Sequence, residues 1–376
     1  MIATRPIERL NLATLLQQES ALQRSLVEDF LQCRTTNLVD LSKIKLNSNA
    51  RQISFIDLDE NLLVLVRDAY QTQTVLIPLS QAVKEALSSF RISLQGSFYE
   101  LPVAQLNQRS YELYQTLIQP LEEKQLIQPG NQLLITSDPN FYDLPFSVLW
   151  TGRNYLIENY QILNSLGGQT TEASPGISPV MITAITDSSG LPPSYPDGID
   201  SSIEAEVQNI EQMFKTSVIL LNKAFQADSF LEMVTKEGFH TLHVSTHGVF
   251  DATSRNPYLY AWDRKVPIAE LNQALLQRSP LNLLVFSACE TIRANPRAII
   301  GLASSAVQAQ SRNLVASLWK VDAEATAKFM TEFYNQLRQG KTPAVALQAA
   351  QIQLIHSDNE MNHPYYWAGF LLFGVD

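Results

Sequence analysis

Apolar residues in the second half of the chain form short continuous runs, and these alternate with segments of helical spacing. The strand-like runs cover residues 179–185, 217–222, 241–247, 281–289, 313–321 and 367–373. The helix-like segments cover residues 203–214, 227–236, 268–277, 299–310, 324–337 and 342–355. Continuous apolar strands are typical of a parallel sheet that is buried on both faces. Their alternation with helices predicts an α/β fold, in which helices cover both faces of a mostly parallel sheet.

The first half of the chain has a different pattern. Residues 7–31 carry leucines at helical spacing among Gln, Glu and Arg, which predicts one or two amphipathic helices. Residues 53–79 contain three short apolar runs with polar breaks, which predicts a meander of three strands. Helical spacing returns over 81–94 and 103–127, and a buried strand is predicted at 133–138.

These patterns predict three parts of the chain. Residues 1–50 hold the amphipathic helices, and residues 53–175 hold the meander with its helices. A loop signal at 174–176 precedes the regular βα alternation, so residues 176–376 are predicted to form a second α/β unit.

Composition narrows the class of partner. The 376 residues are 45% hydrophobic and 17% charged, which is typical of a globular protein. The formal net charge is −10, from 27 basic and 37 acidic residues. Phosphate contacts need clustered Lys and Arg, so neither nucleic acid nor an anionic membrane is expected as a partner. A basic peptide would be the more natural electrostatic partner.

Two cysteines, Cys33 and Cys289, are too few for a disulfide framework. Free thiols persist in reducing compartments, so a cytoplasmic location is expected. The first residues lack the apolar stretch of a signal peptide, and the chain has no run of about 18 apolar residues that would predict a membrane span.

Two of the strand-like runs end in residues that suit thiol hydrolysis. The run TLHVSTH ends at His247 before Gly248, and the run LNLLVFSAC ends at Cys289 before Glu290. In open α/β sheets the functional crevice lies outside the carboxyl ends of the strands. A thiolate there is the nucleophile, and a neighbouring imidazole takes the thiol proton or holds the ion pair. The pattern therefore predicts a cysteine peptidase with a His247–Cys289 dyad.

Each of these residues has a simpler interpretation when taken alone. A cysteine at a strand end is often a small hydrophobic residue. His243, Ser245 and His247 alternate onto one strand face, and His243 is expected to be a hydrogen-bonded core histidine. The backbone N–H groups of Gly248 and Cys289 are the expected donors to a developing oxyanion.

Metal and cofactor chemistry are not expected from this sequence. The five histidines are scattered, and the spacing of His243 and His247 would suit a metal only on a helix, whereas a strand is predicted there. The glycine-containing loops lack the spacing and the following Lys-Ser or Lys-Thr of a phosphate-binding loop. The proposed dyad needs no cofactor.

Six segments, in chain order, resemble a known family. They are LYQTLIQPLE (113–122), DLPFSVLWTGRNYLIENYQI (143–162), HVSTHGVFD (243–251), LVFSACET (284–291), VASLWKVD (315–322) and HPYYWAGFLLFG (363–374). From about Ile53 onward the chain resembles a CHAT domain, a caspase-like and separase-like cysteine peptidase module that is common in bacteria. The resemblance implies the caspase–hemoglobinase fold, a three-layer αβα sandwich. It also implies that residues 53–175 are a degenerate, non-catalytic caspase-like half beside the catalytic half, 176–376.

The resemblance places the family's catalytic histidine on His247 and its nucleophile on Cys289. It also implies that the loop after the Leu-Trp strand end lines the pocket for the residue before the scissile bond, where Asp322 could pair with Arg or Lys. Relatives frequently carry two consecutive acids there, whereas this chain has Asp322 followed by Ala323. Asp322 could equally cap the next helix, and Asp251 has the same two interpretations.

The expected function is a cysteine endopeptidase that cleaves protein substrates after a basic residue. The N-terminal helices are expected to bind a regulatory protein. Two alternatives remain from the sequence: a catalytically silent scaffold or binding module in a larger signalling assembly, and a small-molecule thiol hydrolase such as an amidase.

Overall fold

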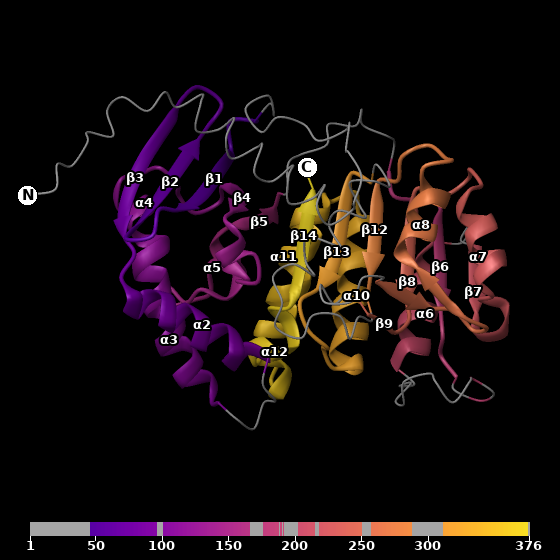
Figure 1. Cartoon of the computed structure of the whole chain (residues 1–376). Coiled ribbons are helices and arrows are strands. Elements are labelled where there is room, and N and C mark those ends of the chain that lie inside the picture. The colour runs from indigo at the N-terminus through magenta and orange to yellow at the C-terminus, as the bar shows by residue number, and fades with distance from the viewer. Residues whose placement is uncertain are drawn as a thin grey trace, which may run out of the picture.

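The computed structural model describes residues 46–95, 101–165, 176–187, 189, 191, 202–214, 218–249, 257–287 and 311–374. The helices predicted within 1–50 and over 299–310 lie outside these residues. The described chain builds one eleven-stranded sheet, in the order β3-β2-β1-β4-β5-β14-β13-β12-β8-β6-β7 (Figure 1). Most neighbouring strands in this sheet are parallel, so the predicted mixed α/β fold with a large, mostly parallel sheet is confirmed.

The predicted meander forms one end of the sheet. Its antiparallel strands are β1 (Ala50–Asp57), β2 (Asn61–Arg67) and β3 (Thr72–Pro78). The turn between β1 and β2 contains Asp59 at a φ of 66°, a left-handed conformation that Asp tolerates better than most residues. Strand β4 (Gln132–Ser137) then pairs in parallel with β1, and β5 (Gln161–Asn164) pairs in parallel with β4.

Five parallel strands form the other end of the sheet. They are β6 (Val180–Ala184), β7 (Val218–Leu221), β8 (Thr241–Ser245), β12 (Leu283–Phe286) and β13 (Asn313–Ser317). Strand β14 (Phe370–Gly374) is antiparallel to β13 on one side and pairs with β5 on the other. The last strand of the chain therefore joins the two ends of the sheet.

The helices that Figure 1 labels have these bounds: α2 Gln81–Gln95, α3 Val103–Leu117, α4 Gln119–Glu123, α5 Leu156–Asn159, α6 Ser202–Met213, α7 Ala227–Val234, α8 Ile268–Leu275, α10 Ala323–Arg338, α11 Pro343–Ile355 and α12 Pro364–Trp367. Helix α10 packs against both α6 and α11, and α7 packs against α8. Short 3₁₀ turns lie at Pro139–Phe141, Phe146–Val148, Asn222–Ala224 and Glu360–Asn362.

The helix predicted over 103–127 is divided into α3 and α4. Ile118 ends α3 and begins α4, in which Pro120 occupies the first turn. Proline has no backbone N–H and its ring clashes with the preceding turn, so it begins a new helix more readily than it continues one.

A small second sheet was not predicted. Its antiparallel strands are β9 (Gly248–Val249), β10 (Tyr258–Tyr260) and β11 (Lys265–Pro267), with β10 in the middle. Because β9 begins immediately after His247, this sheet anchors the segment that leaves the main sheet at β8.

One hydrophobic cluster runs through both ends of the main sheet. Polar contacts also cross between the two ends. Gln348 of α11 donates through Nε2 to the carbonyl oxygens of Ile157 and Tyr160, and His356 Nε2 lies 3.1 Å from Glu158 Oε1. The predicted domain boundary near residue 175 lies outside the described residues and stays a prediction.

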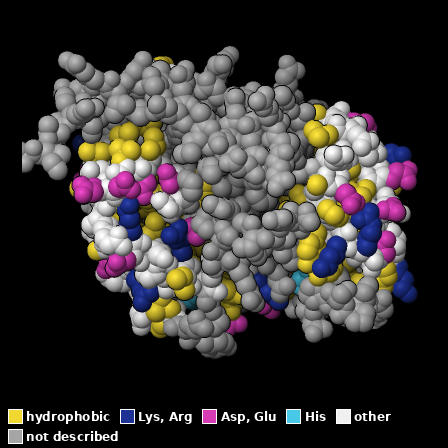
Figure 2. Space-filling view, viewed as in Figure 1, with side chains coloured by type: hydrophobic (Ala, Val, Ile, Leu, Met, Phe, Trp, Pro, Cys, Tyr) yellow, Lys and Arg dark blue, Asp and Glu magenta, His cyan; other side chains and the backbone are white. Residues whose placement is uncertain are grey.

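The visible surface carries both signs of charge. In Figure 2, described Lys and Arg side chains are interspersed with Asp and Glu side chains on this face. Within the described residues, no helix combines the length and hydropathy needed to cross a membrane.

Candidate active site

The candidate site lies where β8 and β12 end. These two strands are parallel neighbours, and Phe286 of β12 stands opposite Val244 of β8. One residue further on, the backbone N–H of Ser287 donates to the carbonyl oxygen of Val244 at 3.1 Å. The carboxyl ends of both strands therefore lie at the same edge of the sheet, as Figure 1 shows.

His247 is the second residue after β8, and its backbone is fixed by β10. Its carbonyl oxygen accepts a hydrogen bond from the backbone N–H of Tyr260 at 2.9 Å. The preceding residue, Thr246, donates through Oγ1 to the carbonyl oxygen of Tyr260 at 2.8 Å. The His247 side chain is half-buried. The second sheet thus fixes the chain that carries this imidazole.

Gly248 is the first residue of β9, and it stands opposite Leu259 of β10. It is buried, and it is not among the glycines that adopt a positive φ. The expectation that its N–H is an oxyanion donor therefore depends on close approach of a substrate rather than on a special backbone conformation. It stays a prediction.

Cys289 and Asp251 lie outside the described residues. The last described residue before Cys289 is Ser287, which is buried at the end of β12. The description of β12 therefore ends two residues before the predicted nucleophile. The pairing of Cys289 with His247 stays a prediction, and so does the role of Asp251.

His243 is a fully buried histidine with three polar neighbours. Its Nε2 lies 2.9 Å from Glu206 Oε1 of α6 and 3.4 Å from Ser287 Oγ. Its Nδ1 lies 3.0 Å from the hydroxyl oxygen of Tyr334 on α10. The interpretation of His243 as a hydrogen-bonded core residue is confirmed. We refer to Glu206, His243, Ser287 and Tyr334 as the buried polar cluster.

Burial further stabilises the protonated form of the cluster's tyrosine. Tyr334 is completely buried, and burial together with the neighbouring Glu206 carboxylate raises its pKa well above the usual value. The phenol therefore stays protonated at neutral pH and can donate to a neutral His243 Nδ1 or accept from a charged imidazole.

Glu206 and Tyr334 were not predicted as partners of His243, although the sequence carries a signal for each. Glu206 lies on the same face of α6 as the buried Ile203, Val207 and Ile210. An acidic residue on the apolar face of an amphipathic helix indicates a buried partner. Tyr334 likewise lies among buried apolar residues of α10.

Asp322 caps α10. Its Oδ1 accepts a hydrogen bond from the backbone N–H of Ala325 at 3.0 Å, so the capping interpretation is confirmed. The residue is exposed. Burial and the charge of Asp322 raise the pKa of Tyr365 above its usual value, so the carboxylate acts electrostatically on that phenol. The role of Asp322 in a substrate pocket stays a prediction.

The loop between β13 and Asp322 is held by the segment around α12. The indole N–H of Trp319 donates to the carbonyl oxygen of Tyr365 at 2.9 Å, and the Tyr365 hydroxyl donates to the carbonyl oxygen of Lys320 at 2.8 Å. Gly369 packs so closely that a Cβ there would lie 2.9 Å from Trp319 Cε2. These contacts hold the loop that carries Asp322.

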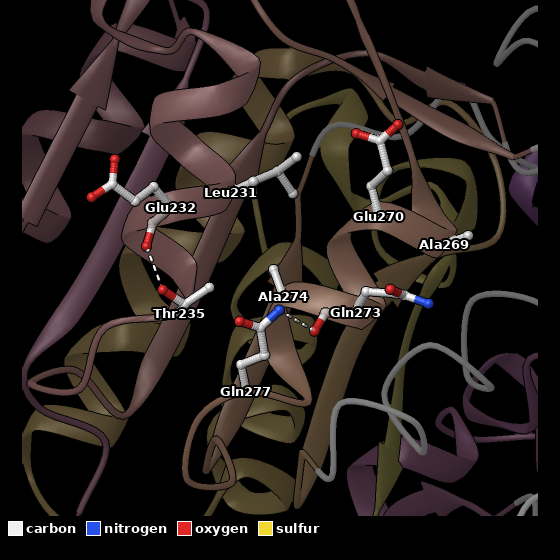
Figure 3. A pocket seen from close by; sticks show the side chains of 8 residues that line it. All are labelled: Leu231, Glu232, Thr235, Ala269, Glu270, Gln273, Ala274 and Gln277. Carbon is white, nitrogen blue, oxygen red and sulfur yellow. Dashed lines mark hydrogen bonds between the residues drawn. The ribbon is translucent and has the colours of Figure 1, made fainter.

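A separate groove of about 630 Å³ lies between α7 and α8 (Figure 3). It is lined by residues such as Leu231, Glu232, Glu270, Gln273 and Ala274, and none of the described residues that line it carries a thiol or an imidazole. This groove is therefore not the candidate site for thiol hydrolysis. The described residues also contain no group of three or more His, Cys, Asp or Glu residues that could hold a metal ion.

Comparisons with known proteins identify the family and the fold. The family model of the CHAT domain matches residues 107–375. Tetratricopeptide repeat protein 28 of Homo sapiens is 30% identical over 99 residues, and its counterpart in Mus musculus is 28% identical over 101 residues. Each match covers 26% of this chain, but only 4% of the relative's length.

Among solved structures, the Saccharomyces cerevisiae separase–securin complex at 3.0 Å resolution matches with a TM-score of 0.55 and 10% identity. That match covers 96% of this chain and 31% of the other chain. The Arg-specific cysteine proteinase gingipain R matches with a TM-score of 0.44 and 9% identity, over 87% of this chain and 77% of the other. At such low identity the separase match shows the fold alone.

Proposed function

Because the chain belongs to the CHAT domain family, we propose that it is a cysteine endopeptidase with His247 and Cys289 as its catalytic dyad. The observation that supports this proposal is the pairing of β8 and β12, whose register continues to Ser287. His247 and Cys289 each follow the carboxyl end of one of these two neighbouring strands, where open α/β sheets carry their functional residues.

The proposed reaction uses the thiolate of Cys289 as the nucleophile. His247 takes the thiol proton, and the sulfur attacks the peptide carbonyl carbon to form a tetrahedral intermediate. The backbone N–H groups of Gly248 and Cys289 stabilise its oxyanion. His247 then returns the proton to the leaving amine, and water, activated by the same imidazole, hydrolyses the thioester to release the acid and the free thiol.

We propose a preference for Arg or Lys before the scissile bond, through the carboxylate of Asp322. Capping of α10 uses Oδ1 and leaves the negative charge in place. The two roles of Asp322 are therefore compatible.

Replacing Asp322 with asparagine separates the two roles. Asn is nearly as good an N-cap as Asp, so the Tm should be almost unchanged, whereas loss of the charge should lower kcat/KM for Arg and Lys substrates by about tenfold or more. Asp322→Ala is the matched variant, which should also lower stability by about 1 kcal/mol through loss of the cap. Unchanged selectivity in Asp322→Asn would contradict the pocket role.

Labelling by a substrate-like inhibitor tests the proposed function. The protein is incubated with a peptide acyloxymethylketone that ends in arginine, and its intact mass is measured. We expect one added inhibitor group, lost in Cys289→Ala and kept in Cys33→Ala, the matched control for the other thiol of the chain. Labelling that persists in Cys289→Ala would overturn the assignment of the nucleophile.

A second candidate is a catalytically silent binding module within a larger assembly. The match to tetratricopeptide repeat protein 28 favours it, because the matched region is a small part of a much longer chain. The absence of labelling under every condition would favour this candidate. A small-molecule amidase, the third alternative, would instead hydrolyse simple amides and leave peptides intact.

We also propose that residues 1–50 bind a regulatory protein in the cytoplasm, on the basis of their amphipathic pattern. Deletion of residues 1–45 should then alter the control of activity and the binding of that partner, as measured by cleavage assays and pull-down with the full chain as control. Unchanged control and binding would contradict this proposal.

A further inference from the structure

The buried polar cluster connects four elements in the interior, next to the strand ends that form the candidate site. Glu206 belongs to α6, His243 to β8 and Tyr334 to α10, while Ser287 follows β12. All four side chains are buried, with exposed fractions of 3% or less. The protein retains an ionisable pair in its interior, where desolvation is costly. The mechanism proposed above uses none of these groups.

We propose that His243 is a positioning residue, which Glu206 and Tyr334 hold in place and which fixes the end of β12 ahead of the nucleophile. This inference rests on the proposed function, because Ser287 lies two residues before Cys289 in the chain. His243 touches neither substrate nor the reacting atoms in this proposal and acts only through Ser287.

The polar atoms of the cluster constrain the imidazole from both sides. The Glu206 carboxylate lies beside one ring nitrogen, with Oε1 2.9 Å from Nε2, and the Tyr334 hydroxyl lies 3.0 Å from Nδ1. A carboxylate on one nitrogen and a hydroxyl on the other hold the ring orientation, as the partners of metal-bound or catalytic histidines do. Tyr334 itself is held by ring contacts with Phe214 and Phe333.

Ser287 contacts β8 through two of its atoms. Its backbone N–H donates to the carbonyl oxygen of Val244 at 3.1 Å, and its Oγ lies 3.4 Å from His243 Nε2. The neighbouring hydroxyl on β8, Ser245 Oγ, is buried and has no hydrogen-bond partner among the residues that the structure describes. Among the described residues, the contact of His243 with Ser287 is a polar side-chain link between the ends of β8 and β12.

Two conservative variants test the proposal. Glu206→Gln keeps the shape and removes the charge, and Tyr334→Phe removes only the hydroxyl. Tyr155→Phe is the matched control, since Tyr155 is also a buried tyrosine, and it donates to Asn107 Oδ1 at 2.7 Å, outside the buried polar cluster. The Tm of each variant shows whether it folds, and all measurements are made well below the lowest Tm.

Two readouts are compared with the wild-type protein. We expect backbone amide exchange in peptides that cover residues 283–287 to become about tenfold faster in Glu206→Gln and Tyr334→Phe, and to stay unchanged in Tyr155→Phe. We also expect kcat for peptide cleavage to fall about tenfold at unchanged KM, because a slightly misplaced nucleophile lowers turnover without lowering binding.

Faster exchange together with the lower kcat would support the positioning role. Exchange at the rate of the control, or faster exchange with unchanged kcat, would overturn it. If the wild-type protein neither cleaves peptides nor accepts the inhibitor, the proposed function fails. Amide exchange over residues 283–287 can still be measured in a protein without activity. If Glu206→Gln and Tyr334→Phe then exchange at the rate of Tyr155→Phe, the cluster does not hold the strand end and the inference is overturned.

Discussion

Replacing His247 with alanine is expected to lower kcat for peptide cleavage by about 10²- to 10⁴-fold, the usual contribution of a general acid–base residue. The imidazole is required twice in the proposed reaction, to take the thiol proton and to protonate the leaving amine. Since His247 is half-buried and its backbone is held by Tyr260, the substitution should leave the fold intact. Steady-state kinetics and the Tm measure the two effects.

His240→Ala is the matched control, because His240 lies at the amino end of the same strand. It should retain full activity. The pH dependence of Cys289 alkylation gives a second measurement: a thiol activated by His247 should titrate well below about 8.5, and should return to that value in His247→Ala. Equal turnover in the His247 and His240 variants would contradict the dyad.

Replacing His243 with leucine is expected to lower the free energy of unfolding by about 3–5 kcal/mol. The substitution leaves the Glu206 carboxylate in the interior without its imidazole partner, and the exposed fraction of Glu206 is only 1%. The buried carboxylate then loses the interaction that offsets its desolvation. Urea denaturation, with the slope checked for two-state behaviour, measures the loss.

The double variant Glu206→Leu with His243→Leu sharpens this test. Replacing both members of a buried pair with apolar residues of similar volume is often nearly neutral, so the double variant should recover most of the stability. A loss of less than about 1 kcal/mol in His243→Leu would contradict a coupled pair. So would a loss in the double variant equal to the sum of the losses in Glu206→Leu and His243→Leu measured separately.

The sequence predicts the main sheet well because each strand carries its own signal. Runs such as VMITA in β6 and LLVF in β12 are apolar throughout, as strands covered on both faces must be. His243 shares a strand face with His247, but only His247 stands beside a glycine, and this difference indicates that His243 is a core histidine. The strand predicted to end at His247 ends two residues earlier, at Ser245, because the chain there turns toward the second sheet.

Other elements depend on contacts that the local sequence does not contain. Strands β9–β11 are only two or three residues long, and they form because β10 pairs with both neighbours. The strand predicted from Trp367 begins at Phe370, because Pro364 starts a one-turn helix that His363 caps. The partnership of Glu206 with His243 likewise requires the packing of α6 on the sheet.

Strand β14 has a consequence for the integrity of the molecule. It lies between β13 and β5, while α11 contributes hydrogen bonds to the carbonyl oxygens of Ile157 and Tyr160. The carboxyl-terminal segment is therefore an integral part of the amino-terminal half. If the backbone were cut between residues 165 and 176, the two pieces would stay associated. Two fragments expressed separately would be expected to reassemble.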